Sequence, residues 1–344
     1  MKQNLIFTND VEGALQRLIA DGGHNMTVWL ADVNTARFVP NGERIVAIPS
    51  GDESKSLETV CRVWDEMERM GVTRHSLIIN LGGGMVTDLG GFAAATFKRG
   101  VRFINVPTTL LGAVDAAVGG KTGFNYNGLK NEIGAFAIAS DVVISTRYFD
   151  TLPIEEMKSG FAEVIKHAML SDRGEFLRLL NHNFNAPIVH DDLLERLRHS
   201  VQVKVDIVAR DPNEQGERKA LNLGHTVGHA FESLAMRRGA PVPHGYAVVW
   251  GLVTEAVLSH LLMKFPSEDV HSLGNFVRDN YRDFPFTCDD YDELLDLMSH
   301  DKKSRDGEIT CTLLNTIGNY HVDQTITLGD MTAALDILRD HLGM

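Results

Sequence analysis

The sequence predicts an α/β chain, with a parallel sheet and crossover helices in its N-terminal half and a mostly α-helical C-terminal half. Through about residue 150, short β-rich runs alternate with helical stretches. From Leu152-Pro153 onward the pattern changes to long helical periodicity. At 344 residues and 44% apolar content the chain can bury a large core, and such a length is typical of about two domains. We therefore predict an α/β domain over 1–152 and a mainly α-helical domain over 153–344.

The N-terminal strands are predicted from five runs rich in β-branched and other apolar residues. The runs lie at 26–32, 44–50, 76–84, 101–107 and 141–146. Between the second and third runs, SLETVCRVWDEMERMG has the periodicity of an amphipathic helix. Strands joined through helices pair in parallel, because each crossover helix carries the chain back to the end of the sheet at which the previous strand began.

The C-terminal half is predicted to be helical from three long periodic segments. They span 155–170, 191–210 and 244–264. A small β element over 308–322 interrupts this pattern, and a last helix is expected from about Met331. We find no internal repeat, low-complexity tract or flexible linker.

Composition excludes several classes of function. A formal net charge of −13 argues against nucleic acid or an anionic membrane surface as the partner, because both favour broad basic patches. The three cysteines are widely spaced, which fits neither a disulfide framework nor a zinc ribbon. The N-terminus MKQNLIFTND lacks the apolar stretch of a signal peptide, and no run of about 18 apolar residues occurs. We expect a cytoplasmic protein.

A glycine-rich turn, LGGGMVTDLGG, follows the strand SLIIN and precedes a helix-compatible run. Backbone N–H groups at such a helix N-terminus can hold a pyrophosphate, as in a Rossmann-like nucleotide domain. However, Thr87 stands where a strict GxGxxG motif has its last glycine. A tight turn followed by close packing at Gly90 and Gly91 therefore remains an alternative.

Four residues are candidates for a metal site: Glu163, His225, His229 and His244. Two imidazoles and a carboxylate leave a zinc ion one open position, which is typical of a catalytic site. Each signal also has a purely structural interpretation. His225 and His229 share a helix face at i, i+4, as do many pairs that bind nothing. His244 could cap a helix.

Glu163 and Lys166 could likewise form an ordinary helix ion pair worth about 0.2–0.5 kcal/mol. Yet Glu163 lies in the apolar segment FAEVI, where an unpaired carboxylate would be costly to bury. A cation or a metal is therefore expected beside it.

Taken in order, the segments resemble those of the 3-dehydroquinate synthase family. The resemblance rests on GDESKS, LGGGMVTDLGGFAAATFKRG, VPTTLLGAVDAAVGGKTGFN, KNEIGAF, TLPIEEMKSGFAEVIKHA, ERKALNLGHTVGHAFE, HGYAVVWG and DKK. Related cyclases acting on other sugar phosphates alter GGKT and GHTxGHA, whereas this chain keeps both. The chain departs from the family pattern at Tyr246, where glutamate is more usual. It also has VDAAVGG where the family usually has VDSSVGG.

The resemblance implies that the enzyme uses NAD⁺ and one divalent metal, Zn²⁺ or Co²⁺. The implied metal ligands are Glu163, His225 and His244. The implied NAD⁺ contacts are Asp32, Asp52, Lys55, Gly83, Gly84, Asp88, Thr108, Thr109, Lys121, Lys130, Thr151 and Leu152. The implied substrate and catalytic residues are Asp115, Lys121, Asn131, Lys166, Lys204, Arg218, Asn222, His229 and Lys302, with Arg99 reaching a neighbouring subunit's phosphate. A homodimer follows from this last assignment.

The reaction implied is conversion of 3-deoxy-D-arabino-heptulosonate 7-phosphate, a sugar phosphate, into 3-dehydroquinate and phosphate. A hydroxyl is transiently oxidised by NAD⁺, phosphate is eliminated, the ketone is reduced, and ring opening precedes an intramolecular aldol closure. Two alternatives remain. A metal-dependent polyol dehydrogenase of related fold would not need so many cations. A non-catalytic sugar-phosphate sensor would not need the complete set of proposed ligands.

Overall fold

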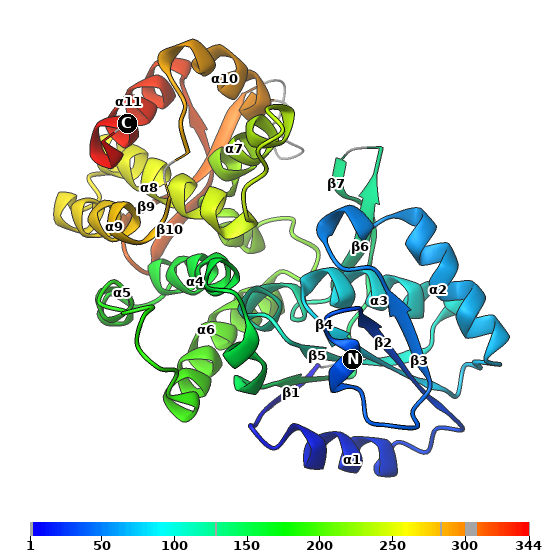
Figure 1. The fold of residues 1–344 in the computed structure, drawn as a ribbon. Coiled ribbons are helices and arrows are strands. Elements are labelled where there is room, and N and C mark those ends of the chain that lie inside the picture. Colours follow the sequence, from blue (N-terminus) through cyan, green and yellow to red (C-terminus); the bar gives the residue numbers. More distant parts are fainter. Residues whose placement is uncertain (1–2, 128, 283, 300–307, 344) are drawn as a thin grey trace. The chain divides into compact units, whose positions relative to one another are not determined.

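The computed structural model describes residues 3–127, 129–282, 284–299 and 308–343. The chain forms two compact units (Figure 1). Unit 1 comprises 1–153 and 187–202, and unit 2 comprises 154–186 and 203–344. The helix α6, His190–Arg210, contributes its first part to unit 1 and the remainder to unit 2.

Unit 1 is built on a six-stranded sheet in the order β1-β8-β5-β4-β2-β3. All neighbouring strands are parallel. The strands are β1 (Asn4–Phe7), β2 (Thr27–Asp32), β3 (Ile45–Ile48), β4 (Leu77–Gly82), β5 (Arg102–Pro107) and β8 (Asp141–Ile144). β4 and β8 are buried along their whole length, which explains why their sequences are mostly apolar rather than alternating, with Asn80 and Asp141 as the exceptions.

The order of the strands creates a topological switch point between β2 and β4. The chain passes from β2 to β3 on one side, and then returns to place β4 on the other side of β2. In open parallel sheets, ligands bind at the carboxyl ends of the strands that flank such a point. The loops that follow β2 and β4 are therefore the expected binding edge.

The edge strand β1 is held to β8 by a buried carboxylate. Asp141 Oδ1 accepts from Asn4 Nδ2 at 2.9 Å, and its Oδ2 accepts from Ser140 Oγ at 2.8 Å and Arg102 Nη2 at 3.1 Å. Burial alone would raise the pKa of Asp141, but these donors outweigh it and lower the pKa below 3.8.

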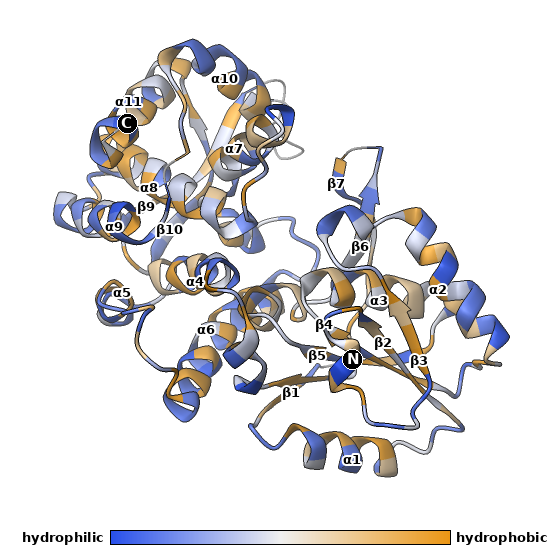
Figure 2. Cartoon of the chain, viewed as in Figure 1, coloured by the Kyte–Doolittle hydropathy of each residue, from blue (hydrophilic) through white to orange (hydrophobic). Residues whose placement is uncertain are grey.

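Three helices and a hairpin complete the scaffold around this sheet. The helices are α1 (Val11–Asp21), α2 (Leu57–Arg69) and α3 (Gly84–Thr96). α3 packs tightly, because a Cβ at Gly90 would lie 2.2 Å from Asn80 Oδ1 and one at Gly91 would lie 2.7 Å from Thr122 Cγ2. In Figure 2 β3 is strongly apolar, whereas α2 carries many hydrophilic residues. The antiparallel hairpin consists of β6 (Lys121–Tyr126) and β7 (Leu129–Phe136).

Unit 2 is mainly helical. Its helices are α4 (Ile154–Met169), α5 (Arg173–Leu179), α7 (His225–Arg237), α8 (His244–Met263), α9 (Ser267–Asn280), α10 (Tyr291–Ser299) and α11 (Leu328–Leu342). An antiparallel hairpin of β9 (Ile309–Thr316) and β10 (Asn319–Ile326) packs against α8. α8 is long and apolar enough to cross a membrane, but 78% of its most apolar 18-residue stretch is buried inside the protein. It is the central helix of unit 2, because α4, α7, α9, α11 and β9 all contact it.

The predicted fold class is confirmed, and each of the five predicted N-terminal strands forms. The sequence prediction did not include β1, which is only four residues long, or the hairpin β6–β7. Two glycines, Gly119 and Gly120, directly precede this hairpin. Both have left-handed φ values of 94° and 73°, and they link the π-helical turn Gly112–Ala116 to β6. The proposed division at 152/153 remains a prediction.

Candidate functional site

Three helices of unit 2 bring the predicted metal ligands together. Glu163 comes from α4, His225 is the first residue of α7, and His244 is the first residue of α8. Nε2 of His225 lies 3.4 Å and Nε2 of His244 lies 3.7 Å from the same oxygen, Oε1 of Glu163. Tetrahedral zinc with bonds of about 2.0–2.1 Å holds its ligand atoms about 3.3–3.4 Å apart. The donor types and their spacing therefore fit such an ion.

Each imidazole is oriented through its other nitrogen. His225 Nδ1 lies 3.1 Å from the carbonyl oxygen of Leu223, and His244 Nδ1 lies 3.2 Å from Oε2 of Glu232. Both acceptors favour a proton on Nδ1, which leaves the lone pair of Nε2 for a metal. Glu232 was not singled out from the sequence. Its position at i+7 from His225, on the same helix face, was the available signal.

Glycines allow these helices to approach closely enough to form the cluster. A Cβ on Gly251 of α8 would lie 2.0 Å from the carbonyl oxygen of Gly224, the residue before His225. A Cβ on Gly245 would lie 1.9 Å from the carbonyl oxygen of Ser159 on α4. Gly245 N–H also donates to Ser159 Oγ at 3.0 Å. The backbone around His225 and His244 is thus fixed by direct contact with neighbouring helices.

The expected cation beside Glu163 is Lys166. Glu163 is fully buried and Lys166 is 1% exposed, and Lys166 Nζ pairs with Glu163 Oε2, one helical turn away. The two carboxylate oxygens therefore face different partners, since Oε1 faces the two imidazoles. Burial of the His244 ring lowers its pKa, but Glu232 and Glu163 more than offset this effect and raise the pKa to about 10, so a metal would have to displace the proton on Nε2 in order to bind there.

His229 belongs to the same group of imidazoles. Its ring centroid lies 5.5 Å from that of His225 and 6.1 Å from that of His244. Nitrogen and oxygen atoms of His229, Glu232 and His244 also lie within 4.8 Å of one another, as do those of Glu163, His225 and His244. His229 is therefore close enough to act beside a metal. His229, Glu232 and His244 together are an alternative set of metal ligands.

Two further predicted cations of unit 2 are buried as well. Lys204 of α6 is 6% exposed and Arg218 is 2% exposed. Arg218 Nη1 donates to the carbonyl oxygen of Pro212 at 2.7 Å. Asn222, which the sequence also selected, donates to Oε1 of Glu214 at 3.1 Å. None of these cations is a surface residue, and buried cations are costly unless anions lie nearby.

The predicted nucleotide residues of unit 1 gather at the carboxyl ends of adjacent strands. Gly83 and Gly84 begin α3 directly after β4, and Thr108 and Thr109 follow β5, which pairs with β4. A Cβ on Gly83 would lie 3.0 Å from Cγ2 of Thr109, so a side chain there would crowd the adjacent loop. Asp32 ends β2, on the other side of the switch point. This edge fits a pyrophosphate at the N-terminus of α3.

A network of charged and amide groups adjoins this edge. Lys55, 4% exposed, donates to Asp88 Oδ2 at 2.6 Å and to Asn131 Oδ1 at 2.5 Å. Lys130 Nζ lies 3.4 Å from Asp52 Oδ2. The structure thus joins residues predicted to bind the cofactor to Asn131, which was predicted to bind the substrate.

The remaining predicted residues are more dispersed. Asp115 lies in the π-helical turn Gly112–Ala116, and Lys121 is exposed at the start of β6. Thr151 ends a short 3₁₀ helix that Leu152 caps. Arg99 is exposed and has a φ of 66°. Lys302 lies outside the described residues.

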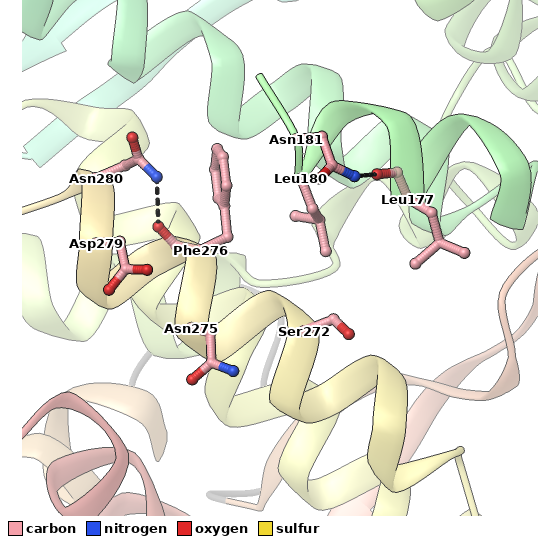
Figure 3. Close-up of a pocket in the computed structure, with 8 residues that line it drawn as sticks. All are labelled: Leu177, Leu180, Asn181, Ser272, Asn275, Phe276, Asp279 and Asn280. Carbon is pink, nitrogen blue, oxygen red and sulfur yellow. Dashed lines mark hydrogen bonds between the residues drawn. The ribbon is translucent and has the colours of Figure 1, made fainter. Parts of the chain in front are cut away.

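A separate hollow in unit 2 lies between α5 and α9 (Figure 3). Its lining residues are Leu177, Leu180, Asn181, Ser272, Asn275, Phe276, Asp279 and Asn280. Two of its amides donate to carbonyl oxygens four residues earlier in the chain, Asn181 to Leu177 at 2.8 Å and Asn280 to Phe276 at 2.9 Å. None of the lining residues belongs to the predicted site.

Comparison with known proteins matches both parts of the chain to one family. Residues 45–159 match the model of the 3-dehydroquinate synthase N-terminal domain, and 160–304 match that of its C-terminal domain. A 3-dehydroquinate synthase from Parabacteroides distasonis is 40% identical over 352 residues, covering 100% of this chain and 99% of the relative. One from Pyrococcus abyssi is 43% identical over 281 residues, covering 81% of this chain and 80% of the relative.

Solved structures share the fold at lower identity. A 2-epi-5-epi-valiolone synthase from Streptomyces hygroscopicus, with NAD⁺ and Zn²⁺ bound, has a TM-score of 0.84 at 24% identity, covering 99% of this chain and 97% of that one. A 2-deoxy-scyllo-inosose synthase complexed with carbaglucose-6-phosphate, NAD⁺ and Co²⁺ has a TM-score of 0.81 at 21% identity, covering 98% and 96%. The resemblance seen in the sequence is confirmed by the family models and the relatives, and the chain belongs to the 3-dehydroquinate synthase family of enzymes.

Proposed function

We propose that this chain converts 3-deoxy-D-arabino-heptulosonate 7-phosphate into 3-dehydroquinate and phosphate, using NAD⁺ and one Zn²⁺ or Co²⁺. Besides family membership, one observation carries the proposal. Two imidazole nitrogens face one oxygen of the fully buried Glu163 in a unit that also buries three cations. Such a site suits an anionic, hydroxylated substrate.

Glu163, His225 and His244 would hold the metal. When bound, the ion would supply Lewis acidity that lowers the pKa of a coordinated substrate hydroxyl. Lys166 holds Oε2 of Glu163, so that Oε1 stays directed at the histidines. Lys166 also adds a positive charge that favours the alkoxide form of that hydroxyl.

Arg218, Lys204 and Asn222 would bind the anionic groups of the substrate. A buried guanidinium can bind phosphate or carboxylate through two parallel hydrogen bonds, which fixes orientation as well as charge. His229 would transfer a proton at the leaving phosphate, because an imidazole nitrogen can both donate and accept a proton. Oxidation of the C5 hydroxyl to a ketone would acidify the hydrogen on C6, so that the phosphate on C7 can leave by elimination, and the cations stabilise the charge that develops on the leaving group.

Unit 1 would bind NAD⁺ at the carboxyl edge of its sheet. Gly83 and Gly84 would place backbone N–H groups at the pyrophosphate, with Thr108 and Thr109 on the adjacent loop. Asp32, at the end of β2, would accept hydrogen bonds from a ribose through Oδ2, since its Oδ1 already accepts from the N–H groups of Asn34 and Thr35. When bound at this edge, NAD⁺ would supply reversible hydride transfer with no net redox change.

The homodimer is also a proposal. Lys98 and Arg99 have successive left-handed φ values of 49° and 66°, a strained backbone for residues other than glycine, and both side chains are exposed. This segment would present Arg99 to the phosphate of a neighbouring subunit. Sedimentation equilibrium would detect the dimer. Loss of activity in Arg99→Ala, with its recovery in mixed dimers containing a partner inactivated at His229, would demonstrate action in trans.

The test of the reaction is an incubation of the protein with NAD⁺, Zn²⁺ and the heptulosonate phosphate, with substrate in large excess over NAD⁺. We expect many phosphates released per NAD⁺ and no steady growth of NADH absorbance. A polyol dehydrogenase would instead oxidise glycerol-like substrates and stop after one NADH per NAD⁺. Stoichiometric NADH without phosphate release would refute the proposed reaction.

A further inference from the structure

We propose that Glu232 is a positioning residue that fixes the tautomer and orientation of His244 as a metal ligand. The inference rests on the proposed function, because it concerns the same metal site. It starts from burial. The Glu232 side chain is only 5% exposed, and a carboxylate in such surroundings needs a donor or a cation. His244 Nδ1, 3.2 Å from Oε2 of Glu232, is such a donor.

The two nitrogens of His244 face two different carboxylates. Nδ1 faces Glu232, and Nε2 faces Glu163 at 3.7 Å. A neutral imidazole has one N–H and one lone pair, so only one nitrogen can bind a metal. A proton on Nδ1 satisfies Glu232 and directs the lone pair of Nε2 toward Glu163. Nε2 of His225 faces the same oxygen of Glu163, so in this tautomer the lone pair of His244 is directed at the other two proposed ligands.

The two histidines differ in what holds them. The acceptor for His225 Nδ1 is a neutral backbone carbonyl, whereas the acceptor for His244 Nδ1 is a carboxylate. A charged acceptor forms a stronger hydrogen bond and makes the ring a better electron donor to a metal. Glu232 is also anchored on α7, so it ties the first residue of α8 to the helix that carries His225.

One competing arrangement uses the same atoms. His229, Glu232 and His244 also lie close enough to hold an ion, and Glu232 would then be a ligand itself. The convergence of both Nε2 atoms on Glu163 favours the orienting role. The two arrangements make opposite predictions about which substitution abolishes metal binding.

The experiment measures Co²⁺ binding to the metal-free full chain by chelator competition and by visible absorption. Glu232→Gln keeps an oxygen acceptor of the same size and removes the charge, and Glu232→Asp shortens the side chain. Glu293→Gln is the matched control, because Glu293 is 41% exposed and pairs with Arg237 on the surface of the same unit. Thermal unfolding of each metal-free variant reports any purely structural effect.

For Glu232→Gln we expect one Co²⁺ per chain, a Kd raised about 10- to 100-fold and a shifted visible spectrum. Glu232→Asp should fall between this variant and the unmodified protein, and Glu293→Gln should bind as the unmodified protein does. An unchanged Kd and spectrum in Glu232→Gln, whether or not stability falls, would overturn the inference. So would loss of the ion in Glu232→Gln together with its retention in His225→Ala. An unmodified chain that binds no Co²⁺ would instead refute the proposed metal site, and the inference with it.

Discussion

Replacing Gly251 with alanine tests whether helix packing sets the geometry of the metal ligands. The new Cβ would lie 2.0 Å from the carbonyl oxygen of Gly224 and 2.9 Å from the backbone nitrogen of Gly228. Both neighbours are backbone atoms of the segment that carries His225, so no side chain can rotate away. Real Cβ contacts are almost never shorter than 3.0 Å, so the segment must shift by about 1 Å relative to α8.

This shift should weaken metal binding, because a metal site tolerates only small changes in the positions of its ligand atoms. Metal–ligand distances hold to within about 0.2 Å, so a shift of about 1 Å takes His225 out of range of an ion held by His244. We expect the Gly251→Ala variant to lose about 100-fold or more in Co²⁺ affinity and in kcat. Overpacking should also lower the free energy of unfolding by about 1–3 kcal/mol.

The assay combines Co²⁺ titration, phosphate release and urea unfolding of the metal-free protein. Gly329→Ala is the control, because Gly329 lies in α11 and its Cβ would meet only Thr327 Oγ1, at 3.9 Å. That variant should be as stable as the unmodified protein or slightly more so, since alanine favours the helix. Gly251→Ala with Co²⁺ affinity and kcat within about twofold of the unmodified protein would refute the packing argument.

Three other substitutions test separate parts of the structure. Arg218→Ala should lower kcat/KM by about 100-fold or more. The control Arg237→Ala, which changes a side chain that is 57% exposed, should leave kcat/KM unchanged. Equal kcat/KM values for the two variants would place Arg218 outside the substrate site. Burial raises the pKa of Asp141, but its hydrogen bonds lower it more strongly, so the pKa lies below 3.8 in the folded protein. The carboxylate therefore stabilises the fold above pH 3.8, and this stabilisation is lost as the pH falls through the lowered pKa. Asp141→Asn should therefore cost about 1–3 kcal/mol in urea unfolding at pH 7 and progressively less below pH about 4; a pH-independent difference would contradict this. Glu255 Oε2 accepts from Gly224 N–H at 2.7 Å, so Glu255→Ala should lower the free energy of unfolding in urea by about 1–3 kcal/mol. Glu255→Gln keeps an oxygen acceptor and should cost less. Equal losses in the two variants would point to the charge of Glu255 rather than to this hydrogen bond.

The sequence by itself determined the layers of the fold and the residue types of the site. Buried parallel strands leave continuous apolar runs and long helices leave a 3.6-residue period, so both were visible in the sequence. β1 was not, because only Ile6 of its four residues is β-branched, whereas three of four are β-branched in the equally short β3 and β8. Ordered motifs sufficed to indicate the family, and Glu163 drew attention because a carboxylate in an apolar helical segment needs a partner.

Only the tertiary structure decided which atoms meet. A long stretch of chain separates α4 from α7, and a short loop joins α7 to α8, but in neither case can local periodicity state how the helices cross. Their crossing depends on the small size of Gly245 and Gly251, which allows backbone contacts that a side chain would prevent. The role of Glu232 likewise emerged only from the fold, because a buried acidic residue reveals its partner only when a second helix packs against it.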